Sequence, residues 1–182
     1  MANTTGKKIK DAAIIGGCAS LIYLTIGDIS YRLSLSRGGL NSKLITDMVA
    51  KSAAKKPKNE YKEKLDSMID DGADWFMHQD TEKIIIEKKH RQSLYADLIR
   101  PDKPSNVYII CIHGYTSSPA NMGIYAKKYH ELGYNVLLPS LRGHGDSEQD
   151  FITMGWNDRL DVIEWINYIA ERHPESKIIL HG

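Results

Sequence analysis

Cysteine, charge imbalance and internal repetition are all scarce in this 182-residue sequence. Its two cysteines, Cys18 and Cys111, lie in separate apolar stretches, so we expect no disulfide between them and no cysteine-based metal site. The 24 basic and 23 acidic residues give a net charge of +1, which offers no general electrostatic argument for binding nucleic acid. We therefore expect a globular protein without a cofactor or metal and without a nucleic acid partner.

The longest stretch without charge is Ala12 to Gly27, and Lys7, Lys8 and Lys10 precede it. As a helix it would be roughly 24 Å long, at about 1.5 Å per residue, which is short of the ~30 Å hydrocarbon core of a bilayer. Basic residues before an apolar run are typical of a signal peptide or a signal anchor. We expect residues 1–30 to anchor or export the protein, with membrane anchoring through residues 12–27, at a bacterial cell surface. A buried or interfacial helix is the alternative.

Residues 31–80 are expected to form a helical lead-in. Apolar residues at helical spacing predict one helix over Leu40 to Ala54 and a second over Asn59 to Phe76, separated by the basic boundary Lys55 to Lys58. The pair Trp75-Phe76 closes the second helix. We expect these two rings to pack onto the domain that follows.

The sequence pattern changes from residue 81 onward, where short strand-like segments begin, and we expect one domain over residues 81–182. Lys83 to Glu87 and Ser93 to Ile99 predict an antiparallel hairpin that turns through Lys88 to Gln92. From Asn106 the order is strand, helix, strand, helix, strand, which predicts an α/β fold with a mostly parallel sheet flanked by helices. The expected strands are 107–112, 134–139 and 177–180, and the expected helices are 119–132 and 156–172.

A polar turn, His113-Gly114-Tyr115, ends the apolar run Val107 to Ile112 abruptly. The run is short and apolar throughout, which is typical of a central strand buried on both faces. In an open α/β sheet, ligands bind in the crevice beyond the carboxyl ends of the strands. This turn is therefore the first candidate for chemistry.

Three motifs together resemble those of a known family. They are the strand ending in His113-Gly114-Tyr115, the loop SLRGHGDS at residues 140–147, and the final KIILHG at residues 177–182. Their order is similar to that of the α/β-hydrolase superfamily, in its branch of serine aminopeptidases, monoacylglycerol lipases and esterases. The resemblance covers about Glu82 to Gly182.

The resemblance implies a role for each motif. The backbone N–H of Tyr115 would be an oxyanion-hole donor, stabilising the charge that develops on the carbonyl oxygen in acyl transfer, and His113 and Gly114 would shape its turn. The SLRGHGDS loop would be scaffolding, with Asp146 bracing it. Ser147 and His144 would accordingly be neither nucleophile nor base.

By the same resemblance, Gly182 would be the first glycine of the nucleophile elbow G-x-S-x-G. The serine would then stand two positions beyond it, with the acid and the base later, and His181 would pack or orient. We expect the N-terminal part of a serine hydrolase that cleaves small ester or amide substrates through an acyl-enzyme, inactive as given. An aspartate at the elbow, as in dehalogenases and epoxide hydrolases, is a second interpretation. A truncated, non-catalytic interaction protein tethered to a membrane is a third.

Overall fold

A computed structural model describes residues 3–40, 43–54, 59–88 and 92–182. It contains a five-stranded sheet in the order β1-β2-β4-β3-β5. The strands are β1 (Glu82–Ile86), β2 (Leu94–Ile99), β3 (Val107–Cys111), β4 (Asn135–Pro139) and β5 (Lys177–His181). The helices are α1 (Asn3–Leu35), α2 (Arg37–Leu40), α3 (Lys43–Ala54), α4 (Glu60–Met77), the 3₁₀ helix η1 (Pro119–Met122), α5 (Gly123–Glu131) and α6 (Asp158–Arg172).

The strand pairing confirms the predicted α/β fold. β3 pairs in parallel with both β4 and β5, whereas β2 is antiparallel to β1 and to β4. The hairpin of β1 and β2 is confirmed as well, with Glu82 opposite Leu98 and Ile86 opposite Leu94. Part of its predicted turn, residues 89–91, lies outside the described residues.

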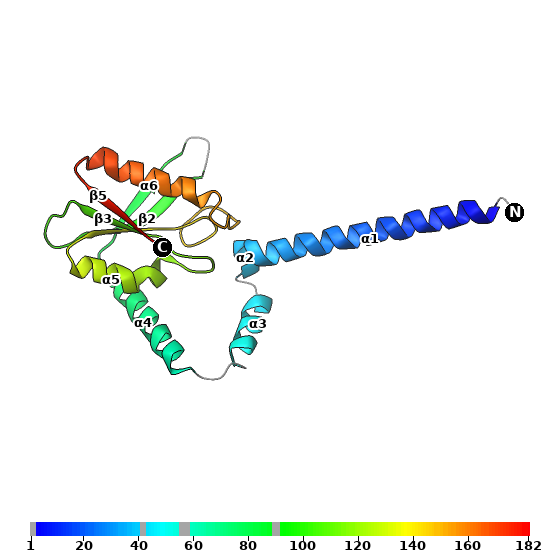
Figure 1. Cartoon of the computed structure of the whole chain (residues 1–182), viewed down its shortest axis with the longest axis horizontal. Helices are drawn as coiled ribbons and strands as arrows, with labels where there is room; N and C mark the ends of the chain where they lie inside the picture. The colour runs from blue at the N-terminus through cyan, green and yellow to red at the C-terminus, as the bar shows by residue number, and fades with distance from the viewer. Residues whose placement is uncertain (1–2, 41–42, 55–58, 89–91) are drawn as a thin grey trace.

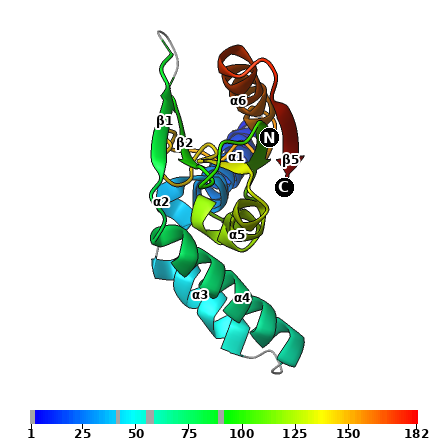
Figure 2. The same cartoon turned by 90° about the vertical axis from the view of Figure 1, so that its left-hand side faces the viewer.

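Two hydrophobic cores lie on opposite faces of the sheet. Because side chains alternate along a strand, Tyr108 and Ile110 of β3 belong to one core, and Ile109 and Cys111 belong to the other. The first core includes Trp165 and Ile169 of α6, and the second includes Met122 of η1 and Ala126 of α5. The run without polar residues in β3 is thus explained by helices on both faces (Figure 2).

Helix α4 belongs to the same packed unit as the sheet. Phe76 is buried in the core beneath α5, and Trp75 packs against that core, which confirms the packing predicted for this pair. The axes of α4 and α5 approach closely where Gly72 faces Gly123. A Cβ built on Gly123 would lie 2.1 Å from the carbonyl oxygen of Gly72.

Most element boundaries fall within two residues of the predicted ones, with one difference of type. Instead of one α-helix from Pro119, the chain forms η1 and then α5. Pro119 occupies the first position of η1, where its fixed φ is favourable, and the side chain of the preceding Ser118 makes no capping hydrogen bond. The α5 helix ends at Glu131, and Gly133 follows with a φ of 79°.

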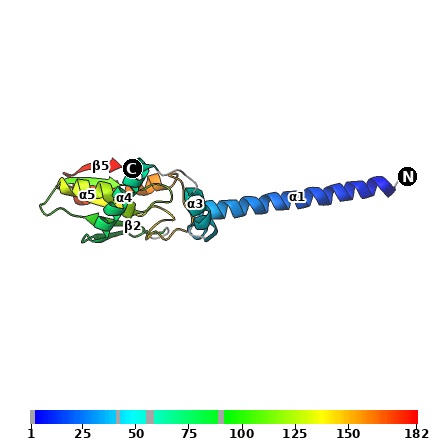
Figure 3. The same ribbon diagram turned by 90° about the horizontal axis from the view of Figure 1, so that it is seen from below.

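Helix α1 extends away from the domain as a single helix of 33 residues (Figures 1 and 3). It runs through the predicted boundary at residue 30, and the division into three segments stays a prediction. Large apolar side chains along it are exposed, including Leu21, Tyr23 and Leu24, so they are not buried by the described part of this chain. The buried or interfacial helix stays an alternative prediction. Within the residues described, no helix is both long enough and apolar enough to cross a membrane.

Candidate functional site

The predicted motifs meet at the carboxyl edge of the parallel strands. His113 to Tyr115 follow β3, the SLRGHGDS loop follows β4, and Gly182 follows β5. A Cβ at Gly182 would lie 3.2 Å from the carbonyl oxygen of Ile112, so this end of β5 sits directly beside the turn. The structure therefore brings together residues that are far apart in the sequence.

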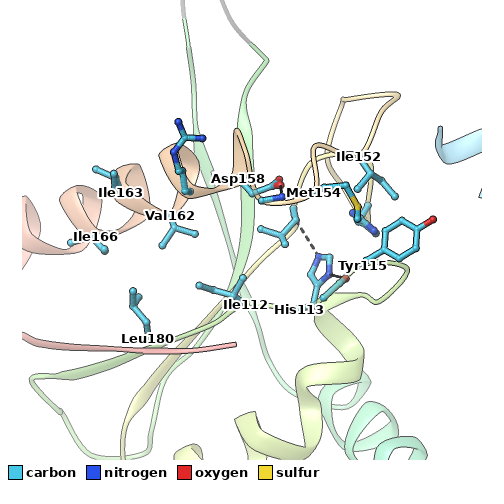
Figure 4. A pocket seen from close by; sticks show the side chains of 15 residues that line it. Ile112, His113, Tyr115, Ile152, Met154, Asp158, Val162, Ile163, Ile166 and Leu180 are labelled. Atoms are coloured by element: carbon cyan, nitrogen blue, oxygen red, sulfur yellow. Dashed lines mark hydrogen bonds between the residues drawn. The ribbon is translucent and has the colours of Figure 1, made fainter. Parts of the chain in front are cut away.

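An apolar cavity of about 720 Å³ opens beside the turn (Figure 4). Its floor is formed by Ile112 and Leu180 at the strand ends, and one wall by Val162, Ile163 and Ile166 of α6. His113, Gly114 and Tyr115 line the same cavity, together with Leu141, His144, Ile152, Met154, Gly155, Asp158 and Arg159. A cavity of this size and lining suits the apolar part of a small molecule.

His113 is a fixed, neutral part of the turn. The residue is only 2% exposed; Nδ1 lies 3.0 Å from the carbonyl oxygen of Gly114, and Nε2 accepts a hydrogen bond from the backbone N–H of Leu141 at 3.2 Å. Nδ1 therefore carries the proton and donates it to Gly114. Burial lowers the pKa of His113 below its ordinary value of 6.5, and this outweighs the opposing effect of the hydrogen bond to Gly114. These contacts suit shaping a turn rather than transferring protons.

Tyr115 presents an unused backbone donor at this turn. No acceptor for its N–H is found among the described residues, and its side chain is 46% exposed. The next residue, Thr116, has a φ of 57°, which is unusual for a residue other than glycine. A Cβ on Gly114 would meet no atom within 4 Å, so packing among the described residues does not require glycine there. The open space remains available to a ligand that approaches the Tyr115 N–H.

The SLRGHGDS loop is held by its own buried serine. The Ser147 hydroxyl donates to the side-chain oxygen of Gln149 and accepts from the backbone N–H groups of Gly143 and Gln149. Ser147 is 3% exposed, so its hydroxyl is used up inside the loop. Gly143 has a φ of 75°, and a Cβ on it would lie 2.9 Å from the backbone nitrogen of Ile152. This geometry agrees with the scaffolding interpretation of Ser147.

Two carboxylates of α6 anchor the loop, and sequence reasoning missed this. Arg142 forms a two-point ion pair with Asp161, with Nε–Oδ2 at 2.6 Å and Nη2–Oδ1 at 2.8 Å, and this pair raises the pKa of Arg142. Asp158 is buried and accepts from the backbone N–H of Arg142 and Gly155 and from the Thr153 hydroxyl. From the sequence, both aspartates are expected only to favour the positive end of the helix. The spacing of the two aspartates in the sequence does not indicate that they contact an arginine 16 and 19 positions earlier.

The remaining polar predictions have mixed outcomes. Asp146 does brace the loop, but through an ion pair of 2.7 Å with Lys83 on β1 rather than within the loop. His181 packs as expected, between the rings of Tyr125 and Tyr129, and its Nδ1 lies 2.7 Å from the Tyr129 hydroxyl oxygen.

His144 adds one unsatisfied group to the cavity wall. Its Nδ1 lies 2.9 Å from the carbonyl oxygen of Arg142 and donates to it, which leaves Nε2 as an acceptor. This Nε2 is buried without a hydrogen-bond partner among the described residues. Over the same residues there is no group of three or more side chains able to hold a metal ion.

Comparison with known proteins finds similarity to a lipase and to an esterase. No protein-family model matches the sequence. A thermostable monoacylglycerol lipase from Bacillus sp. (strain H-257) is 28% identical, in a match that covers 38% of this chain and 37% of the lipase. An esterase from Pyrococcus furiosus has a similar structure, with a TM-score of 0.51 and 27% identity, covering 58% of this chain and 41% of the esterase. The chain thus spans well under half the length of either relative.

These relatives agree with the arrangement of the described residues. The mixed sheet, with its parallel strands β4, β3 and β5, has the turn at residues 113–115 and the loop at residues 140–147 along one edge. The fold and the sequence similarity together place this chain in the α/β-hydrolase superfamily.

Proposed function

We propose that this chain forms the oxyanion-hole half of a serine-hydrolase site that cleaves carboxylic ester or amide bonds. The observation that carries the proposal is the unpartnered N–H of Tyr115 beside an apolar cavity at the carboxyl edge of the sheet, as far as the described residues extend. A positioned backbone donor in a site shielded from water stabilises the oxyanion of acyl transfer. The cavity would hold the acyl chain, and the activities for which the two relatives are named, lipase and esterase, favour esters as the substrate class.

In this proposal the nucleophile is a serine two positions beyond Gly182, supplied by the rest of the enzyme. Gly182 supports it because the space around its Cα is tight: a Cβ added there would lie 3.2 Å from atoms of Ile112. A glycine is favoured at such a close approach. The serine would attack the substrate carbonyl carbon, the alcohol or amine would leave, and water would hydrolyse the acyl-enzyme. The chain of residues 1–182 by itself would then be inactive.

The decisive experiment compares two variants that both lose the tyrosine side chain. Tyr115→Pro also eliminates the backbone N–H, whereas Tyr115→Ala keeps it. In the full-length gene product, losing one oxyanion donor should lower kcat on p-nitrophenyl butyrate about 10²- to 10³-fold. Tyr115→Ala keeps the N–H but loses the hydroxyl that bonds Ser34, so its kcat should fall by about tenfold or less. Circular dichroism spectra would verify that both variants fold.

Labelling with a fluorophosphonate tests the nucleophile separately. We expect the full-length gene product to be labelled and residues 1–182 alone to remain unlabelled. A full-length product that is neither labelled nor active on esters would rule out the serine hydrolase and leave the aspartate elbow and the non-catalytic interaction protein, which the residue two positions beyond Gly182 would distinguish.

Localisation at a bacterial cell surface remains a proposal that rests on residues 1–30. Its support is the order of basic residues before the apolar stretch 12–27, with side chains such as Leu21 and Leu24 exposed in the structure. Fractionation of cells that express the protein, with a mass measurement of the mature N-terminus, would test it. Recovery of the uncleaved protein in the cytosolic fraction would contradict both anchoring and export.

A further inference from the structure

The end of helix α1 lies against the loop that borders the candidate site. The backbone N–H of Ile152 donates to the carbonyl oxygen of Leu35 at 2.8 Å, and the N–H of Arg37 donates to that of Asp150, also at 2.8 Å. Between these two bonds, Ser36 and Phe151 form an antiparallel β-bridge. The rings of Tyr31 and Phe151 stack with their centroids 5.5 Å apart. We call residues 31–37 the docking segment.

Arg37 extends this contact into the SLRGHGDS loop. Its Nη2 donates to the carbonyl oxygen of Ser147 and lies 3.4 Å from that of His144. A guanidinium presents several donors in a fixed plane, so it can hold two neighbouring carbonyl groups at once. Arg37 therefore fixes the backbone of the loop whose His144 lines the cavity.

The docking segment also contacts the residue that carries the candidate oxyanion donor. The Tyr115 hydroxyl donates to the carbonyl oxygen of Ser34 at 2.6 Å, across 81 positions of sequence. Figure 4 shows the Tyr115 ring at the rim of the cavity, with its hydroxyl directed away from Ile163 and Leu180. The side chain of Tyr115 is thus held from outside the cavity that this residue lines.

We propose that the docking segment is a positioning element for the oxyanion turn. It holds Tyr115 at one end through Ser34 and the neighbouring loop at the other through Arg37, so both sides of the cavity mouth are tied to one short stretch of backbone. An oxyanion donor must be fixed before the reaction to be effective. This inference rests on the proposed function, because its effect on rate appears only in an active enzyme.

Hydrogen exchange at two amides measures the docking independently of enzyme activity. The N–H groups of Arg37 and Ile152 bond across the interface, so their hydrogen exchange requires the docking segment to separate from the loop. Tyr115→Phe removes only the hydroxyl. From the usual contribution of one hydrogen bond, the protection of both amides against exchange should decrease by about two- to tenfold.

A second variant and a control complete the exchange measurement. Arg37→Gln removes a charged donor from two carbonyl groups, so protection of the same amides should fall between about tenfold and about 100-fold, and Arg37→Lys should restore part of it. Tyr61→Phe, at an exposed tyrosine of α4, should leave both amides unchanged. Unchanged exchange at Arg37 and Ile152 in both Tyr115→Phe and Arg37→Gln would overturn the proposal.

The kinetic measurement separates this inference from the proposed function. In the full-length enzyme, Tyr115→Phe should lower kcat by about the same two- to tenfold and leave KM nearly constant, because the donor acts mainly in the transition state. An active enzyme whose kcat is unaffected by Tyr115→Phe and Arg37→Gln would overturn the positioning role while the hydrolase proposal stands. A wild-type enzyme without esterase activity would overturn the proposed function, and the exchange result would still decide the docking.

Discussion

The two faces of the sheet are covered by different helices, although their strands have the same apolar character. On one face, the backbones of α4 and α5 come into contact with each other where Gly72 meets Gly123. Phe76 of α4 is buried in the hydrophobic core on this face. On the other face α6 covers only part of the sheet, and Ile163 and Leu180 are each 50% exposed beside the cavity. Apolar composition therefore predicts burial in general. Ile85 and Ile179, on the outer strands, are also exposed on the α5 face. The exposed apolar surface of the α6 face differs in lying beside the candidate site.

The largest expected effect is a loss of unfolding free energy on the α6 face. The test compares a buried side chain of α6 with a half-exposed one. Trp165 is 1% exposed, and Trp165→Ala should lower the free energy of unfolding by about 3–5 kcal/mol through the cavity it leaves. Ile163→Ala, on the same helix, should cost under about 1 kcal/mol because the side chain is already half in solvent. Urea unfolding of the two variants measures both. Similar losses would show that Ile163 is covered in solution.

The second prediction concerns the close approach on the α5 face. Gly123→Ala should lower the free energy of unfolding by about 1–3 kcal/mol, because the added Cβ forces the α4 and α5 backbones apart. Gly27→Ala is the matched control: a Cβ there meets nothing within 4 Å. Alanine is favoured over glycine in a helix by up to about 1 kcal/mol, so this variant should lose no stability. A tolerated Gly123→Ala would mean that the two helices pack less tightly.

The smallest expected effect is a pH dependence of the unfolding free energy. It originates at His113, at the carboxyl edge of the parallel strands. The pKa of His113 is lowered by burial, so between pH 6.5 and that lowered value the unfolded chain binds more protons than the folded one. The stabilisation is therefore complete above pH 6.5 and is lost as the pH falls through the lowered pKa. We expect His113→Asn to flatten the fall in unfolding free energy as the pH is lowered through this range, measured by urea unfolding at a series of pH values.

A variant without a titratable group serves as the control for this measurement. Gly27→Ala changes no titratable side chain and adds a Cβ that meets nothing within 4 Å, so it should keep the slope of the wild-type protein. An unchanged slope in His113→Asn would contradict the assignment of the effect to this buried ring.

Several elements were predictable because their signals are local. The apolar run from Val107, the break at Gly133 and the amphipathic pattern from residue 156 are each recognised from neighbours within one or two helical turns. The candidate turn was also found in this way, because a polar triplet directly follows a buried strand. The split of one expected helix into η1 and α5 was missed, since Pro119 favours a helix start without specifying its type.

The partners of the polar site residues could not be found in the same way. Asp158 and Asp161 are typical residues of a helix N-terminus, yet both hold Arg142 and its loop. Asp146 lies in a loop and pairs with Lys83, which stands 63 positions earlier on strand β1. Such pairs form only after the sheet has brought distant segments together, and a single sequence contains no pattern that joins them.

By itself, the sequence determined the alternation of strands and helices, the position of the turn at His113 to Tyr115 and the motifs of the hydrolase resemblance. Hydrophobic periodicity and turn chemistry act over a few residues, so they can be recognised along the chain. Only the tertiary structure decided which apolar side chains stay exposed beside the candidate site and which segment holds Tyr115. Those features depend on contacts such as that of Tyr115 with Ser34, whose 81-residue separation is closed by packing of the whole fold.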